Sequence, residues 1–232
     1  MTLIYLVRHG ETDWNLARRI QGSTDIPLNN TGRLQAERTG RLLARRSWDG
    51  IASSPLSRAF ETGTIIADAV GIDPSRIDVL DSLAERRYGE AEGLDDRELF
   101  RLFPGDSPVP GRERREDVAA RVIPALVELA KRYERERDDS AEDARLIVTT
   151  HGGVIRTVVN QVSAQTRYHR GIPITNGSVH SFRHANGALE LVLFNDPIED
   201  ESITDECGDL DDQNAVEQRE VGGEPLRPET KF

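Results

Sequence analysis

Short apolar runs alternate with longer amphipathic stretches along most of this chain. The apolar runs have the length of buried strands, and they fall at residues 3–7, 50–53, 77–80 and 145–150. Helices are predicted between and after them, over residues 33–46, 54–70, 95–102, 113–137 and 154–162. An Asn-Gly turn joins two more apolar runs and predicts a β-hairpin from residues 178–182 and 189–194. Strands that alternate with helices predict an α/β fold, a three-layer α/β/α sandwich with a mostly parallel central sheet.

Two of these helices carry local signals. Ser54-Pro55 is typical of a helix start, with a capping serine followed by proline at the first helical position. Gly71 follows the same helix and is a typical stop. The helix over residues 33–46 is expected to turn three leucines towards the core: Leu34, Leu42 and Leu43.

Charge divides the chain into two parts. Residues 196–232 hold 13 acidic and 3 basic residues, a charge of −10, which leaves −1 for residues 1–195. We expect residues 1–195 to form one folded domain and residues 196–232 to form a disordered or draped acidic tail, because the tail has too few apolar residues to build a core. The nearly neutral body gives no indication of a nucleic-acid partner.

Other features of the composition exclude further classes. The chain has no apolar stretch long enough for a membrane span, and its N-terminal residues lack the pattern of a secretory signal. Cys207 is the only cysteine, so no internal disulfide can form. We expect a cytoplasmic protein that does not contact membranes, and the sequence leaves a homodimer open.

The most informative motif occurs twice. The apolar runs at residues 3–7 and 145–150 are each followed by a histidine and a glycine, His9-Gly10 and His151-Gly152. Each run therefore delivers an imidazole to the carboxyl end of a predicted parallel strand, where open α/β sheets bind ligands. A lone histidine after a strand is usually structural, so the repetition is what points to a shared site.

Two arginines accompany these histidines and suggest which ligand is bound. Arg8 precedes His9, and Arg58 lies in the first turn of the helix after residues 50–53. A guanidinium group stays charged and matches the oxygens of a phosphate. An imidazole is an uncharged nucleophile near neutral pH, and we expect a backbone carbonyl to hold its other nitrogen. His151 and the free N–H groups of the helix after it add positive potential.

These motifs resemble those of the histidine phosphatase superfamily, in its phosphoglycerate mutase-like branch. The resemblance extends over about residues 3–194. It is carried by Leu6 to Thr12 with Asn15, Gln21-Gly22, Ser53 to Ala59, Leu83-x-Glu85 with Tyr88-Gly89, Glu92-Gly93, and Thr150 to Arg156.

The resemblance implies a role for each of these positions. His9 is then the nucleophile that becomes phosphohistidine. Glu85 is the proton donor to the leaving oxygen, although by itself it also fits a salt bridge with Arg86 or Arg87. The implied phosphate ligands are Arg8, Arg58 and His151. The implied substrate-binding residues are Asn15, Gln21, Gly22, Tyr88 and Gly152.

The branch contains both phosphatases and mutases. The run Glu85 to Gly89 is similar to that of the mutases. Asp96 stands where the mutases have a lysine, and the segment Pro110 to Glu113 with Gly153 resembles the phosphatases. We therefore expect a phosphomonoester hydrolase that acts on a small phosphorylated metabolite. The alternatives are a 2,3-bisphosphoglycerate-dependent phosphoglycerate mutase and a non-catalytic phosphate-binding module.

One other pair of histidines invites a metal interpretation. His180 and His184 are four positions apart in a predicted strand and the turn after it, where this spacing separates side chains by about 13 Å. We expect both to be surface residues, and we expect neither a metal ion nor a cofactor. Trp14 and Trp48 are expected to be packing residues.

Overall fold

The computed structural model describes residues 1–136, 143–163 and 171–198. Its centre is a six-stranded sheet in the order β3-β2-β4-β1-β5-β6. The strands are β1 (Thr2–Arg8), β2 (Gly50–Ser53), β3 (Asp78–Val79), β4 (Ala144–Thr150), β5 (Val179–Ala185) and β6 (Ala188–Leu193). The pairs among β1 to β4 are parallel, whereas β5 is antiparallel to β1 and forms the predicted hairpin with β6. The predicted α/β class and mostly parallel sheet are confirmed.

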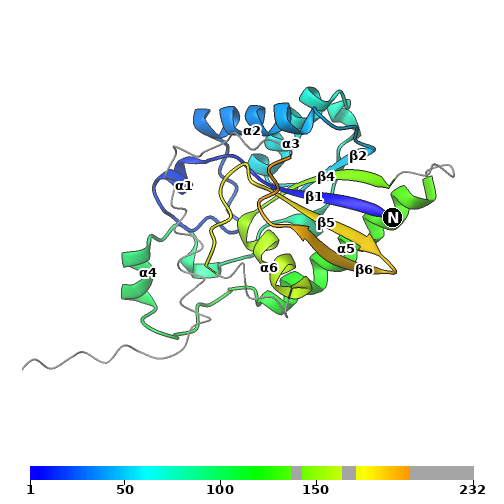
Figure 1. Ribbon diagram of the computed structural model, residues 1–232. Coiled ribbons are helices and arrows are strands. Elements are labelled where there is room, and N and C mark those ends of the chain that lie inside the picture. The colour runs from blue at the N-terminus through cyan, green and yellow to red at the C-terminus, as the bar shows by residue number, and fades with distance from the viewer. Residues whose placement is uncertain (137–142, 164–170, 199–232) are drawn as a thin grey trace, which may run out of the picture.

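Helices cover both faces of this sheet (Figure 1). The long helices are α2 (Asn30–Leu43), α3 (Ser57–Val70), α5 (Arg115–Glu136) and α6 (Gly152–Val162). Side chains alternate between the faces of a strand, so Tyr5 and Val7 of β1 pack with the core of α2 and α3. Ile4 and Leu6 pack with the core of α5 and α6. Because both faces are buried, the central strands are continuously apolar, as in most parallel sheets.

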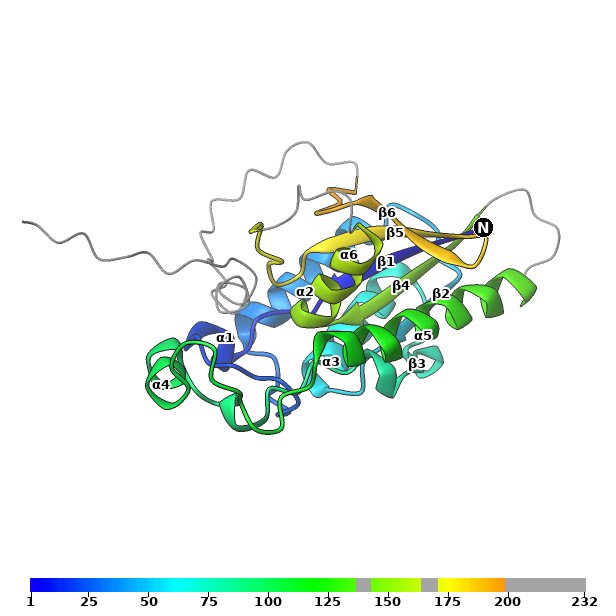
Figure 2. The same ribbon diagram turned by 90° about the horizontal axis from the view of Figure 1, so that it is seen from below.

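Shorter elements lie beyond the carboxyl ends of the parallel strands. Helices α1 (Asp13–Leu16) and α4 (Asp96–Leu102) are on that side of the molecule in both views (Figures 1 and 2). The 3-10 turn Pro74–Arg76 joins α3 to β3 at the opposite ends of the strands, whereas single 3-10 turns at Asp81–Leu83 and Gly89–Ala91 connect β3 to α4 on the side of the carboxyl ends. The strand ends and these connections together surround the site described below.

Three local predictions need correction. Leu34 is 62% exposed, because α2 turns another face to the core; its buried residues are Gly32, Ala36, Thr39, Gly40 and Leu43. Ser54 does not cap α3, which begins at Ser57 after Leu56 and has no side-chain cap. The long helix α5 begins at Arg115, after Glu113 rather than at it. The predicted stop at Gly71 is confirmed, in the left-handed conformation at φ 78°.

The expectation that His180 and His184 are surface residues is wrong. Both are buried, because β5 lies between β1 and β6 rather than at an edge. The Nε2 atom of His180 lies 3.0 Å from Oγ of Ser178, and Nδ1 of His184 lies 3.1 Å from a carboxylate oxygen of Glu134. These contacts make the two histidines part of the core around β5.

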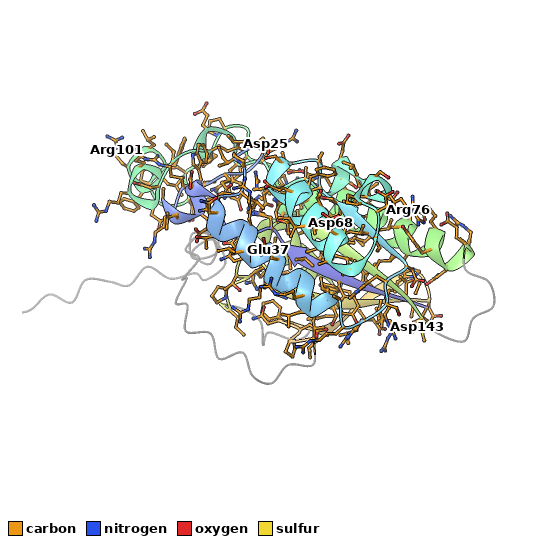
Figure 3. All side chains as sticks on the ribbon, turned by 90° about the horizontal axis from the view of Figure 1, so that it is seen from above. Asp25, Glu37, Asp68, Arg76, Arg101 and Asp143 are labelled. Atoms are coloured by element: carbon orange, nitrogen blue, oxygen red, sulfur yellow. The ribbon has the colours of Figure 1, made fainter. Side chains whose placement is uncertain are left out.

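The outer surface carries many charged side chains. Figure 3 shows Glu37 on α2 and Asp68 on α3 projecting away from the sheet, and both are exposed. Trp48 packs edge-on against Tyr5 at 4.8 Å between ring centroids, as expected of a packing residue. No helix in the described part of the chain is long and apolar enough to cross a membrane. Most of the predicted acidic tail, residues 199–232 with Cys207, lies outside the described residues. Its first three residues are described, and Ile198 is buried in the core of α2 and α3.

Candidate active site

The two histidines of the repeated motif lie side by side. Strands β1 and β4 are parallel neighbours, and their register pairs Arg8 with Thr150. The residues that follow, His9 and His151, therefore leave the sheet at the same point. Their ring centroids are 5.2 Å apart at an interplanar angle of 60°, and both side chains are buried. The sequence repetition thus corresponds to a single site.

The ring of His9 is fixed by its own backbone turn. Its Nδ1 atom lies 2.7 Å from the carbonyl oxygen of Gly10, so Nδ1 carries the proton and Nε2 keeps a free lone pair. The expectation of a backbone carbonyl is confirmed. The turn needs glycine, because a Cβ at position 10 would lie 2.2 Å from the carbonyl oxygen of Gly32. Asn176 also contributes, donating its side-chain amide to the carbonyl oxygen of His9 at 2.9 Å.

Two buried guanidinium groups lie near these rings. Arg58 donates to the carbonyl oxygens of Thr24 and Gly22 at 2.9 and 2.8 Å. Arg8 donates to the carbonyl oxygen of Ile174 at 2.6 Å. Backbone carbonyls orient a guanidinium group without cancelling its charge, so positive potential is concentrated at the carboxyl ends of β1 and β4.

This environment keeps both imidazoles neutral. The pKa of His9 lies well below 6.5, chiefly because burial disfavours the charged ring and also because Arg58 and Arg8 repel it. The pKa of His151 is lowered by the same causes, burial first and then Arg58, His9 and Arg8. Burial also lowers the pKa of Arg58.

Ser54 is a site residue that the sequence did not reveal. Its Oγ atom lies 2.7 Å from Nε2 of His151, and it also accepts the N–H of Leu56 at 3.3 Å. The contact holds one nitrogen of the His151 ring and fixes the orientation of the ring. The other nitrogen, Nδ1, is buried and has no partner among the described residues. The sequence predicts a helix cap at Ser54-Pro55, and a cap gives no indication of this contact.

A pocket opens beside His9. It is lined by His9, Ile20, Gln21, Gly22, Arg58, Glu85 and Tyr88. Apart from Ile20, all of these are predicted site residues. Within the described part of the chain, no group of three or more His, Cys, Asp or Glu side chains is arranged to hold a metal ion.

The other predicted site residues lie around this pocket without lining it. His151 is behind His9, in ring contact with it. Gly152 lies against Arg8, since a Cβ there would be 3.4 Å from Nε of that arginine. Asn15 closes a capping box with Thr12 at the start of α1, and its buried Nδ2 atom has no partner among the described residues.

The carboxylate of Glu85 is held by backbone N–H groups at the pocket. One oxygen accepts from the N–H of Arg86 at 2.8 Å, and the other accepts from the N–H of Gly153 at 3.0 Å. Gly153 belongs to the first turn of α6, where the helix dipole favours negative charge. A Cβ at position 153 would lie 2.7 Å from this carboxylate, so the glycine permits the approach.

Glu92 joins the two walls of the pocket. Its carboxylate accepts the N–H of Tyr88 at 2.9 Å and the N–H groups of Ser23 and Thr24, each at 3.0 Å. Although burial favours the neutral form, these hydrogen bonds hold the pKa of Glu92 below its ordinary value. Gly22 makes room for the carboxylate of Glu92. Its φ is 56°, and a Cβ at this position would lie only 2.2 Å from the carboxylate.

Known proteins are similar to this chain in sequence and in fold. The chain is 37% identical over 195 residues to the uncharacterized phosphatase PhoE of Bacillus subtilis (strain 168), covering 84% of this chain and 95% of that protein. It is 35% identical over 198 residues to phosphoglycerate mutase-like protein 4 of Arabidopsis thaliana, covering 79% and 80%. It superimposes with a TM-score of 0.74 and 27% identity on mycobacterial glucosyl-3-phosphoglycerate phosphatase complexed with VO3, covering 84% and 99%. The family model described as histidine phosphatase superfamily (branch 1) matches residues 4–197, and this chain therefore belongs to that superfamily.

Proposed function

We propose that this protein is a phosphomonoester hydrolase that acts through a phosphohistidine on His9, with a small phosphorylated metabolite as its substrate. One observation carries the proposal. A neutral imidazole with a free Nε2 lies in the same pocket as the Arg58 guanidinium and the Glu85 carboxyl group. These are the nucleophile, the anion-binding group and the acid–base group that phosphoryl transfer needs.

The first half-reaction transfers the phosphoryl group to the protein. Arg58, Arg8 and His151 bind the phosphate oxygens and stabilise the charge that they carry in the transition state. Nε2 of His9 attacks phosphorus while the bond to the leaving oxygen breaks. Glu85, in its protonated form, gives that oxygen a proton, and the alcohol departs.

The second half-reaction regenerates the protein. Glu85 is now a carboxylate, and it takes a proton from a water molecule that attacks the phosphohistidine. The P–N bond breaks, inorganic phosphate forms, and His9 is again neutral. General acid–base help of this kind contributes about 10²–10⁴-fold to the rate. The predicted substrate contacts of Gln21, Gly22, Tyr88, Asn15 and Gly152 belong to the same proposal.

Hydrolysis is favoured over the mutase alternative by the residue at position 96. A mutase keeps a bisphosphorylated intermediate, which needs cations for its second anionic group. Asp96, the acidic first residue of α4, stands at the position where the resembling mutases have a lysine. The run Glu85 to Gly89 supports the mutase alternative. The names of the relatives include both activities, so the distinction needs an experiment.

The test is release of inorganic phosphate from a panel of phosphomonoesters, with His9→Ala as the blank. We expect turnover that the substitution abolishes. Binding of the esters without turnover would instead identify a phosphate-binding module. Conversion of 3-phosphoglycerate to 2-phosphoglycerate that depends on added 2,3-bisphosphoglycerate, with little phosphate released, would identify a mutase.

A further inference from the structure

We propose that the ion pair between Arg121 and Glu113 is the device that positions Glu85 for proton transfer. The proposal rests on the proposed function, in which Glu85 is the acid–base group. Glu85 lies in the connection between the 3-10 turn Asp81–Leu83 and Tyr88, outside any long helix or strand. A segment of this kind has no hydrogen-bonded ladder of its own, so other groups must fix its backbone.

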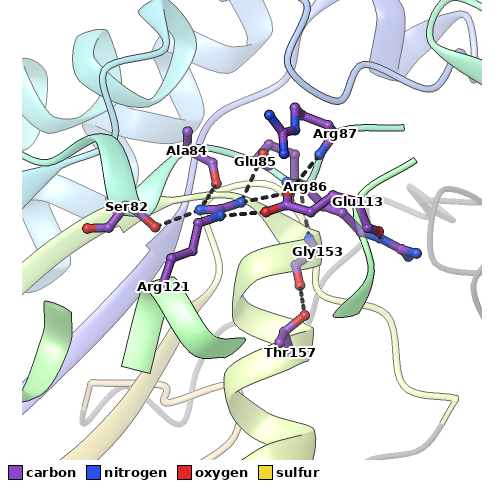
Figure 4. Close-up of polar contacts among 9 residues, drawn as sticks. All are labelled: Ser82, Ala84, Glu85, Arg86, Arg87, Glu113, Arg121, Gly153 and Thr157. Atoms are coloured by element: carbon purple, nitrogen blue, oxygen red, sulfur yellow. Dashed lines mark hydrogen bonds and ion pairs between the residues drawn. The ribbon is translucent and has the colours of Figure 1, made fainter. Parts of the chain in front are cut away.

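Arg121 holds this segment from the side of α5. Figure 4 shows its guanidinium group beneath the backbone of residues 82–85. Nη1 donates to the carbonyl oxygens of Ser82 and Ala84 at 2.6 and 2.8 Å. Nη2 donates to the carbonyl oxygen of Glu85 at 3.3 Å. One side chain therefore fixes three carbonyl groups, including that of the candidate acid.

Glu113 completes the arrangement from the opposite direction. Its two carboxylate oxygens accept from Nε and Nη2 of Arg121 at 2.8 and 3.1 Å. The same carboxylate accepts the N–H of Arg87 at 3.1 Å, and the backbone N–H of Glu113 donates to the carbonyl oxygen of Arg87 at 2.8 Å. The backbone is thus held on both sides of Glu85, by Arg121 before it and by Glu113 after it.

The geometry of this ion pair suits it to fixing the position of a backbone segment. The side chain of Glu113 is 6% exposed and that of Arg121 is 25% exposed. The planar guanidinium group of Arg121 makes two parallel contacts with a carboxylate and also reaches three carbonyl groups. The single nitrogen of a lysine cannot make all of these contacts. Neither side chain lines the pocket. They act through Glu85 and are positioning residues.

This role predicts a specific kinetic signature. A proton donor matters most for a poor leaving group and little for a good one. The value of kcat/KM reports the steps up to the first irreversible one, so it isolates departure of the alcohol from the later attack of water. A misplaced Glu85 should therefore lower kcat/KM for phenyl phosphate and spare 4-nitrophenyl phosphate, whose leaving phenoxide needs no proton.

The experiment compares Arg121→Lys with the unaltered protein on these two esters. We expect kcat/KM for phenyl phosphate to fall about 10- to 100-fold, a part of the full effect of general acid catalysis, with a change of less than about threefold for 4-nitrophenyl phosphate. Glu85→Gln should show the same selectivity. Because both substitutions act on one group, Arg121→Lys should cause little further loss in a Glu85→Gln background.

Arg132→Lys is the matched control. Arg132 also lies on α5 and forms an ion pair, with Asp78 of β3, at a distance from the pocket. The substitution Arg132→Lys should leave the ratio of the two kcat/KM values unchanged, which separates positioning of Glu85 from a general weakening of α5. Glu113→Gln provides a second variant, since it keeps the shape and an acceptor for Arg87 while removing the charge that Arg121 pairs with.

The possible failures are distinguishable. In one outcome, Glu85→Gln lowers kcat/KM for phenyl phosphate alone while Arg121→Lys and Glu113→Gln lower kcat/KM for both esters equally or for neither. That result refutes the positioning role and leaves the proposed function standing. If Arg121→Lys lowers kcat/KM for phenyl phosphate as much in the Glu85→Gln background as in the unaltered protein, the two residues act independently and the inference is wrong. If the unaltered protein turns over neither ester, the proposed function fails and this inference with it.

Discussion

The hydroxyl oxygen of Ser54 lies 2.7 Å from Nε2 of His151, and both side chains are fully buried. This contact holds Nε2 of His151 and fixes the orientation of the ring. Ser54→Ala should therefore lower kcat about 10- to 150-fold, the equivalent of one charge-assisted hydrogen bond in the transition state. The measurement is steady-state turnover of 4-nitrophenyl phosphate.

Ser53→Ala is the control for that substitution. Ser53 is equally buried and its Oγ donates to the carbonyl oxygen of Ser54, but it does not contact either histidine. Similar losses of kcat in the two variants would show that the effect of Ser54→Ala comes from general destabilisation.

Glu92→Gln should impair every substrate alike. Replacing the carboxylate by an amide puts donor against donor at one of the positions now occupied by the N–H groups of Ser23, Thr24 and Tyr88. Hydrogen bonds to a charged group contribute about 1.5–3 kcal/mol each, so we expect kcat/KM to fall about tenfold or more for both phenyl and 4-nitrophenyl phosphate. Glu98→Gln, at a carboxylate of α4 outside the pocket, is the control. A selective loss for phenyl phosphate would contradict this role.

Gly153→Ala should separate stability from catalysis. A methyl group there would lie 2.7 Å from the Glu85 carboxylate and force it to move. Alanine favours a helix over glycine by about 1 kcal/mol, so Tm should stay equal or rise while kcat/KM for phenyl phosphate falls about tenfold. Unchanged kinetics would show that Glu85 need not occupy its observed position.

The two buried histidines make stability depend on pH. Both are neutral in the folded protein at pH values where an exposed imidazole, with a pKa near 6.5, is protonated. The unfolded chain then binds more protons, so the free energy of unfolding falls as the pH decreases below that value, by about 1.4 kcal/mol per pH unit for each histidine. Urea unfolding at several pH values measures the slope. His151→Asn should reduce this slope by the contribution of one proton. An unchanged slope would contradict the conclusion that His151 is neutral in the folded protein.

The sequence revealed those parts of the site whose chemistry lies within a few residues of a strand end. Arg8-His9 and His151-Gly152 follow apolar runs directly, so their meeting at one edge of the sheet could be predicted. Glu92 was visible only as part of a motif, and its contacts with Ser23 and Thr24 span 69 and 68 positions. Contacts of this kind depend on tertiary packing, which no local pattern encodes.

Two errors have a similar cause. Ser54 precedes a proline and a helix. A serine in this pattern can cap the helix or bind a histidine, and only the position of β4, which brings His151 to Ser54, distinguishes the two roles. Leu34 was assigned to the core by its apolar character, yet close packing of α2 against its neighbours favours the small residues Gly32, Ala36 and Gly40 on the buried face. Local propensity could not show which face of α2 is turned inwards.

The central claim is that phosphate is transferred to Nε2 of His9, and trapping the phosphorylated protein tests it most directly. Rapid quenching with alkali during turnover of 4-nitrophenyl phosphate, followed by peptide mass spectrometry, would locate the modification. The account predicts an acid-labile, alkali-stable phosphate on His9 that is absent from His9→Ala. Phosphate on another residue, or continued turnover by His9→Ala, would contradict it.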